Sequence, residues 1–241
     1  MKITVKNLSK KFNNIFAVQD ITFDIPKNKT LGLLGPNGCG KTTSIGMMLG
    51  LIEPSAGQIL YDDKDINTTD KNYLLSQMNF ASPYIELPKK LTVKQNLEVY
   101  GRLYGVVNLN QRILEISSDL NLKSFLEKKT GELSSGQKNR VSLAKSLINK
   151  PKILFLDEPT ASLDPDIGDF VRNYIEDYKS KNDLTILLAS HNMNEVERLC
   201  DQIIMMKEGK IIDKGSCEDL IKLHGRNNLE ETFLKIARGN Q

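Results

Sequence analysis

The chain has 241 residues, of which 39% are hydrophobic and 26% are charged, and this composition excludes a disordered chain. Its net charge of +3 comes from 33 Lys and Arg against 30 Asp and Glu, which is too balanced to predict a nucleic-acid partner. The cysteines, Cys39, Cys200 and Cys217, lie far apart in the sequence, form no metal or redox pair, and favour a reducing compartment.

The first thirty residues alternate between apolar and polar side chains. Ile3 and Val5 follow this rule, as do Ile21, Phe23 and Ile25, so we expect two strands of a half-exposed antiparallel sheet. The N-terminal segment has no apolar region of a signal peptide. No apolar run approaches the ~20 residues of a membrane span, so another chain would supply any membrane part.

Three short apolar runs, at 30–35, 153–158 and 185–191, end in polar or glycine residues. Such runs are typical of parallel strands that are buried on both faces. Helical patterns follow at 41–51 and 166–179. The sequence therefore predicts an α/β fold with a mainly parallel sheet.

Residues 83–148 show helical periodicity and no convincing strand. The apolar positions that carry the pattern are Leu97, Tyr100, Leu103, Tyr104, Val141, Ala144, Leu147 and Ile148. We expect one domain, 1–241, in which 1–82 and 149–241 form the α/β core and 83–148 form an inserted helical subdomain. The tail from about residue 216 predicts two short amphipathic helices.

Residues 35–42, GPNGCGKT, match the P-loop pattern G-x-x-x-x-G-K-[ST] at every position, between an apolar strand and a helix. Glycines let the backbone amides face phosphate oxygens, and the helix N-terminus adds positive potential. Lys41 would neutralise the β- and γ-phosphates, and Thr42 would ligate Mg²⁺. The residues predicted to bind nucleotide here are Gly35, Asn37, Gly38, Cys39, Gly40, Lys41, Thr42 and Thr43.

Cys39 lies inside this loop and has two interpretations. It is either a tolerated small residue or a reactive thiol whose pKa is lowered by the helix N-terminus. In the second case its oxidation would block nucleotide binding.

Three polar residues follow the other apolar runs. Asp157 and Glu158 end one strand, and His191 follows another, so we expect them around one cavity with Lys41. Asp157 would hold Mg²⁺, Glu158 would activate the attacking water, and His191 would sense the γ-phosphate. The alternatives are a solvated acid for Glu158 and a structural histidine for His191.

Residues 133–137, LSSGQ, resemble the LSGGQ signature of ABC-type ATPases, with Ser135 in place of the first glycine. Residues 157–164, DEPTASLD, resemble that family's Walker B motif and D-loop, and Ser190-His191 resembles its H-loop. The motifs occur in the family's order, and the LSSGQ motif has no place in a small-molecule kinase, which excludes that class.

The resemblance implies a head-to-tail dimer with two ATP molecules at its interface. Ser134, Gly136 and Gln137 would then contact the γ-phosphate bound by the other subunit, and Asp164 would contact the partner's site. Ser134 or Ser135 would also cap the following helix, which is the simpler interpretation of the motif. Phe12 matches the adenine-stacking aromatic, with Ala17 beside it, although a core aromatic is the alternative.

One position departs from the family pattern. Where the family usually has a glutamine that reaches Mg²⁺ and the attacking water, this chain has Pro83. Either a water molecule or Glu86 would substitute for the glutamine, or the loop would take another path. This puts coupling and turnover rate in doubt, but not nucleotide binding.

The resemblance implies the separate ATP-binding subunit of an ABC transporter, held at the cytoplasmic face of the membrane by a permease. It would pair with itself or with another ATPase subunit. The surface near Tyr84, Ile85, Leu87, Tyr100 and Tyr104 would contact the permease, unless these side chains are internal packing. With no further domain after residue 241, we expect an exporter. The alternatives are a soluble ABC ATPase of assembly or repair, and a regulatory module that holds ATP without hydrolysing it.

Overall fold

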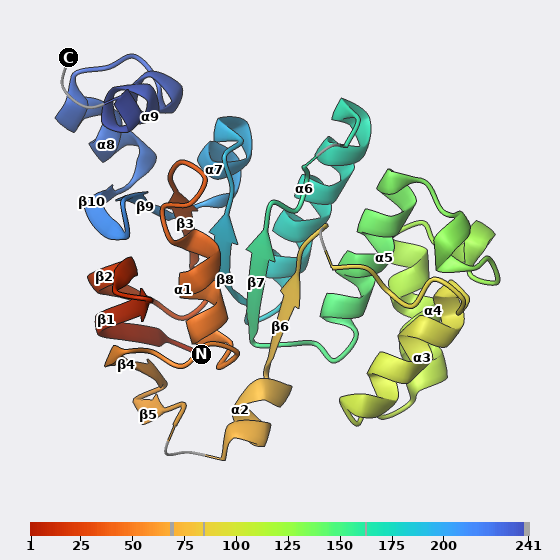
Figure 1. Ribbon diagram of the computed structural model, residues 1–241. Coiled ribbons are helices and arrows are strands. Elements are labelled where there is room, and N and C mark those ends of the chain that lie inside the picture. The colour runs from red at the N-terminus through yellow and green to blue at the C-terminus, as the bar shows by residue number, and fades with distance from the viewer. Residues whose placement is uncertain (68–69, 84, 162, 239–241) are drawn as a thin grey trace. The chain divides into compact units, whose positions relative to one another are not determined.

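The computed structural model describes residues 1–67, 70–83, 85–161 and 163–238. The chain forms two compact units, the first made of Met1–Leu75 and Leu184–Gln241 and the second of Ser76–Asp183 (Figure 1). The predicted segment 83–148 lies within the second unit. Its boundaries as a separate subdomain remain a prediction.

The first unit contains an antiparallel sheet built from the N-terminal part of the chain. Its strands are ordered β2-β1-β4-β5, with β1 at Ile3–Phe12, β2 at Ile15–Ile25, β4 at Ala56–Tyr61 and β5 at Lys64–Asp65. The two strands predicted from alternation are confirmed as β1 and β2, and the apolar residues that carried the prediction, Ile3, Val5, Ile21, Phe23 and Ile25, are buried. Asn13 and Asn14 join them with φ values of 43° and 68°, which is typical of a tight hairpin turn.

The same unit contains strands in the order β10-β9-β3-β8, with β3 at Thr30–Leu34, β8 at Thr185–Ala189, β9 at Gln202–Lys207 and β10 at Lys210–Gly215. β3 runs parallel to both β8 and β9, whereas β10 is antiparallel to β9. Every residue of β3 and β8 is buried, as their continuous apolar runs predicted. The predicted α/β fold with mainly parallel strands is confirmed.

The helices of this unit are α1 (Lys41–Met48), α7 (Met193–Leu199), α8 (Cys217–His224) and α9 (Leu229–Arg238), and α2 (Lys71–Ser76) ends at its boundary. The two predicted tail helices are confirmed as α8 and α9. A buried apolar cluster packs α7, α8 and α9 on the parallel strands; its members are Leu34, Val196, Ile203, Met205, Leu220 and Leu229.

The second unit contains the parallel pair β6 (Met78–Ala81) and β7 (Ile153–Asp157). Its helices are α3 (Val93–Leu103), α4 (Leu109–Asp119), α5 (Ser135–Leu147) and α6 (Pro165–Lys181), with short 3₁₀ turns at Lys123–Phe125 and Thr130–Glu132. The helical periodicity holds for Leu97, which is fully buried, but fails for Leu103 at the end of α3, which is 75% exposed. None of the helices in the described residues is both long enough and apolar enough to cross a membrane.

Candidate functional site

The predicted phosphate loop follows β3 directly and leads into α1. Gly38 and Gly40 have φ values of 79° and 106°, a region in which side chains are strained. A Cβ atom at Gly40 would also lie 2.5 Å from the carbonyl oxygen of Ala17. The loop therefore needs glycine at this position to keep its path beside β2.

Lys41 begins α1 and is 7% exposed. Its Nζ donates hydrogen bonds to the carbonyl oxygens of Gly35 at 2.7 Å and Pro36 at 3.2 Å. The ammonium group is thus held across the loop by two neutral acceptors. Phosphate oxygens carry charge and are stronger acceptors, so an arriving phosphate can replace these carbonyl groups.

The N-terminus of α1 fits an anion. Among the described residues no side chain caps it, and its first turn contains no acidic residue. The first amide groups of a helix need acceptors, and phosphate supplies them together with the charge that the helix dipole favours. Thr42, at the second position of α1, is exposed and therefore accessible to a metal ion. Asn37 is exposed and Thr43 is half-buried.

Cys39 is 3% exposed, and this burial raises the pKa of its thiol, partly offset by the nearby charge of Lys41. The thiol is therefore kept protonated, and the interpretation as a tolerated small residue is the one that the structure supports.

The turn between β9 and β10 makes backbone hydrogen bonds to the phosphate loop and to β2. The N–H of Gly209 donates to the carbonyl oxygen of Cys39 at 3.1 Å, and the carbonyl oxygen of Gly209 accepts from the N–H of Gln19 at 2.8 Å. Gly209 was not among the predicted site residues. A glycine between two charged residues is a turn signal, but nothing in the sequence says which loop the turn contacts.

Phe12 ends β1 and is 48% exposed, which excludes the core-aromatic alternative. The Nζ of Lys10 lies 5.0 Å from the centre of its ring and also donates to the carbonyl oxygen of Glu53 at 2.7 Å. Ala17, half-buried in β2, belongs to the same hairpin. Phe12 thus offers an exposed aromatic surface on which a base can stack.

His191 follows β8, whose last residue, Ala189, is paired with Leu33 of β3. The preceding Ser190 is buried and its hydroxyl accepts from the N–H of Asn192 at 3.1 Å, while His191 itself is exposed. His191 is therefore not a core histidine. Since β3 and β8 are parallel neighbours, His191 and the phosphate loop leave the sheet at the same edge of the first unit.

Asp157 and Glu158 lie in the second unit, at the end of β7, and each is 8% exposed. Glu158 has a φ of 54°, a left-handed conformation that costs a residue with a side chain about 1–3 kcal/mol. Its carbonyl oxygen accepts from the N–H of Ala161 at 3.0 Å. Burial excludes a solvated surface acid for Glu158. A single cavity shared by Lys41, His191, Asp157 and Glu158 remains a prediction.

The signature residues begin α5, and Ser134, rather than Ser135, is the helix cap. The hydroxyl of Ser134 accepts from the N–H of Gln137 at 3.3 Å, and the side-chain oxygen of Gln137 accepts from the N–H of Ser134 at 3.0 Å. Gly136 is buried, and a Cβ atom there would lie 2.7 Å from Cδ1 of Ile167. The small residue lets α5 approach α6 closely.

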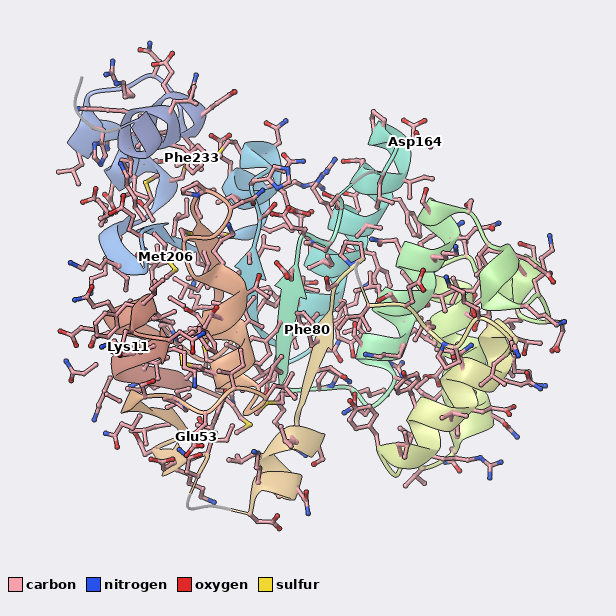
Figure 2. The ribbon with its side chains drawn as sticks, viewed as in Figure 1. Lys11, Glu53, Phe80, Asp164, Met206 and Phe233 are labelled. Atoms are coloured by element: carbon pink, nitrogen blue, oxygen red, sulfur yellow. The ribbon has the colours of Figure 1, made fainter. Side chains whose placement is uncertain are left out.

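Asp164 immediately precedes α6, and Figure 2 shows it at that end of the helix. It is exposed, and its side chain makes no capping bond within the part of the chain that the structure describes. Its carboxylate is therefore presented at the surface of the second unit.

Pro83, the position of the expected glutamine, lines a cavity of about 310 Å³ within the second unit. Glu86 also lines it and forms an ion pair with Lys89 at 2.8 Å; the hydrogen bond from Lys89 lowers the pKa of Glu86. The remaining lining residues are Ser82, Ile85, Leu87, Thr130, Leu133, Ser135, Lys138, Asn139, Val141, Ser142, Ala161 and Leu163.

Only part of the predicted partner surface lies at this cavity. Ile85 is 47% exposed and Leu87 is half-buried. Tyr104 donates from its hydroxyl to Asn79 at 2.8 Å, and the ring of Tyr100 lies 5.2 Å from Nζ of Lys145, so both tyrosines contribute to internal packing. Tyr84 lies outside the described residues.

The family model described as ABC transporter matches residues 18–161, which include the phosphate loop, the signature and the acid pair. The chain belongs to the ABC transporter family. It is an ABC transporter ATP-binding subunit, and its fold and motif order are those of that family.

The curated relatives include an export protein and an import protein. The ABC transporter ATP-binding protein NatA of Bacillus subtilis is 33% identical, over 98% of this chain and 99% of its own length. The Nod factor export ATP-binding protein I of Burkholderia lata is 34% identical, over 91% of this chain and 72% of its own length. The Fe(3+) ions import ATP-binding protein FbpC 1 of Pectobacterium atrosepticum is 32% identical, over 91% of this chain and 62% of its own length.

Solved structures show the same fold. The ATP-binding subunit of an ABC transporter matches with a TM-score of 0.89 at 24% identity, over 98% of this chain and 99% of that chain. The dimeric bacterial ABC transporter cassette MJ0796 matches with a TM-score of 0.81 at 25% identity, over 89% and 98%. This solved cassette, which has the same fold, is dimeric.

Proposed function

We propose that the chain hydrolyses ATP with Mg²⁺ and drives an ABC exporter whose membrane path is a separate permease subunit. The observation that carries the proposal is the phosphate loop, in which buried Lys41 and the uncapped start of α1 present cationic and amide donors together. Thr42 and Asp157 would hold Mg²⁺, which would offset the charge on the β- and γ-phosphates. Phe12 and Ala17 would receive the adenine.

Glu158 would act as the general base, because it is the buried carboxylate next to the proposed metal ligand. His191 would contact the γ-phosphate. The Mg²⁺ site needs few protein ligands, since water and phosphate oxygens complete the coordination of this ion. The described residues contain no cluster of three or more His, Cys, Asp or Glu side chains.

The working unit would be a head-to-tail dimer of this chain with itself or with a related subunit. Ser134, Gly136, Gln137 and Asp164 would complete the ATP site of the other copy. Their support is the N-terminus of α5 and the exposed carboxylate at the start of α6. The dimeric cassette of the same fold supports the assembly.

The permease would contact the cavity that Ile85 and Leu87 line, which would hold the chain at the cytoplasmic face of the membrane. Export is the proposed direction because a relative with 34% identity is a Nod factor export protein. An import protein is also related, so direction is tested by transport into inside-out vesicles that carry both subunits. Uptake of the substrate into these vesicles supports export, and its release from them contradicts it.

The test of the proposed activity is ATP turnover by the purified chain in the presence of Mg²⁺. Wild type should hydrolyse ATP, whereas Glu158→Gln should bind ATP with unchanged affinity and hydrolyse it at least 100-fold more slowly. Pro83 favours a second candidate, a module that holds ATP without hydrolysing it. That candidate predicts ATP binding without turnover in wild type and a gain of turnover in Pro83→Gln.

A further inference from the structure

Asn139 lies one turn into α5, two residues after the signature, and is 9% exposed. Its Nδ2 donates to the carbonyl oxygen of Pro159 at 2.6 Å. Pro159 directly follows Glu158. A single buried side chain thus ties the signature helix to the backbone beside the proposed general base.

The backbone at this point needs such a restraint. Glu158 has a φ of 54°, and a residue with a side chain persists in this conformation only where its surroundings fix it. The amide of Ala161 binds the carbonyl oxygen of Glu158 from one side of the turn, and Asn139 binds the next carbonyl oxygen from α5. Proline has no N–H, so the carbonyl is the one backbone group that residue 159 can offer.

Asn139 also lies at the wall of the 310 Å³ cavity, together with Ser82 and Pro83. A second, small cavity is lined by Pro83, Asn139 and Pro159, among others, so these three residues surround one small space. Glutamine at position 83 would have a side-chain amide, but proline has none. Asn139 is therefore the amide group that faces both the cavity and the backbone after Glu158.

We propose that Asn139 is a positioning residue that fixes Glu158 through Pro159 and connects the cavity wall to the general base. The inference rests on the proposed role of Glu158 in ATP hydrolysis. A shift of α5 or of the cavity wall would move the Asn139 amide and release the Glu158 backbone from its productive conformation. The effect belongs to the chemical step, so kcat changes while ATP affinity does not.

The test compares ATP turnover and ATP binding in variants of the full chain. Asn139→Asp keeps the shape of the side chain but cannot donate when ionised, and Asn139→Ala removes the donor without adding a charge. Both should lower kcat at least tenfold with less than a twofold change in the Kd for ATP. Asn139→Gln, which keeps the amide, should recover at least a third of the wild-type kcat.

The matched control is Asn149→Asp. Asn149 also uses Nδ2 to bind a backbone carbonyl, that of Ser76 at 2.8 Å, but it lies beyond the end of α5. The kcat of the Asn149→Asp variant should stay within twofold of wild type. A kcat within twofold of wild type in both Asn139→Asp and Asn139→Ala would overturn the inference.

A second measurement does not depend on turnover. The exchange rate of the Ala161 amide hydrogen, followed by NMR, reports on its bond to Glu158. It should rise at least tenfold in Asn139→Ala relative to wild type and Asn149→Asp, and equal rates would contradict the inference. If wild type binds ATP without hydrolysing it, the proposed activity fails, whereas the exchange rates still decide whether Asn139 holds this segment.

Discussion

The two helices that carry the phosphate-binding motifs begin in opposite ways. α1 has Gly40 at its cap and, among the described side chains, no oxygen that accepts from its first amides. α5 has a complete capping box, in which Ser134 and Gln137 satisfy each other. The amides at the start of α1 are left to a ligand, whereas one amide at the start of α5 is satisfied by the capping side chain of Ser134.

This difference assigns the two helices different tasks. α1 is prepared for phosphate, because its amides and Lys41 gain stronger acceptors than they have in the free chain. α5 is capped before any nucleotide arrives, and in the proposed dimer a phosphate from a second copy would have to compete with this internal cap. A weaker, exchangeable contact at α5 suits a dimer that forms and separates in every cycle.

The largest expected effect comes from Lys41→Ala. Loss of the ammonium group should weaken ATP binding at least 100-fold, or about 2.8 kcal/mol, because a buried charge that faces phosphate is lost. Titration with a fluorescent ATP analogue measures it. Lys71→Ala is the control, since Lys71 also donates to a backbone carbonyl, that of Gly50 at 3.0 Å, outside the loop. Equal affinities of both variants would contradict the role of Lys41.

The second effect separates two glycines of the same loop. Gly38→Ala should lower the free energy of unfolding by about 1 kcal/mol, because its φ is positive but its surroundings are open. Gly40→Ala should cost about 1–3 kcal/mol more, since its Cβ would meet the carbonyl oxygen of Ala17. Urea unfolding of the two variants tests this order, and equal stabilities would contradict the described path of the loop.

A third effect concerns the pH dependence of thiol reactivity. Since burial raises the pKa of Cys39, the thiol stays protonated in the folded chain at a pH where the unfolded chain has begun to lose its proton. At pH 8.5, iodoacetamide should therefore modify Cys39 at least tenfold more slowly in the folded chain than in urea. Mass spectrometry of the peptide gives both rates. A folded-state rate as high as that of the unfolded chain would restore the interpretation of Cys39 as a reactive thiol.

The smallest effect separates capping from ligand binding. Ser134→Ala and Thr92→Ala each remove a capping box, that of α5 and that of α3, and each should cost about 1 kcal/mol of stability. Only Ser134→Ala should also weaken ATP-dependent dimer formation, by about fivefold. Thermal unfolding and analytical ultracentrifugation report the two quantities. Equal dimer formation in both variants would leave Ser134 with its capping role alone.

Local sequence patterns predict those elements whose apolar periodicity or motif lies within a single short segment. The apolar runs of β3, β7 and β8, the alternation of β1 and β2 and the phosphate loop are of this kind. β9 and β10 are harder to predict. The apolar run of β9, QIIMMK, could belong to a buried strand or a buried helix, and β10, KIIDKG, has no buried residue. α7 was not predicted either, since its apolar positions are few, and α4 was covered only by the general helical prediction for 83–148.

For the candidate site, too, local patterns predict some residues and miss others. Residue types and spacing identify Lys41, Glu158 and Ser134, whereas contacts between distant segments escape the sequence. An asparagine two residues after the signature resembles a surface residue until its bond to Pro159 is seen. The positive φ of Glu158 could not be predicted from the sequence either, because glutamate rarely adopts this conformation and no neighbouring residue indicates it.

Sedimentation of Glu158→Gln with ATP tests the central claim most directly, that α5 of one copy binds the nucleotide held by α1 of another. The account predicts a dimer with ATP and Mg²⁺, a monomer with ADP, and loss of the ATP-bound dimer when Lys41→Ala is added. A monomer in the presence of ATP, at concentrations that saturate nucleotide binding, would contradict it.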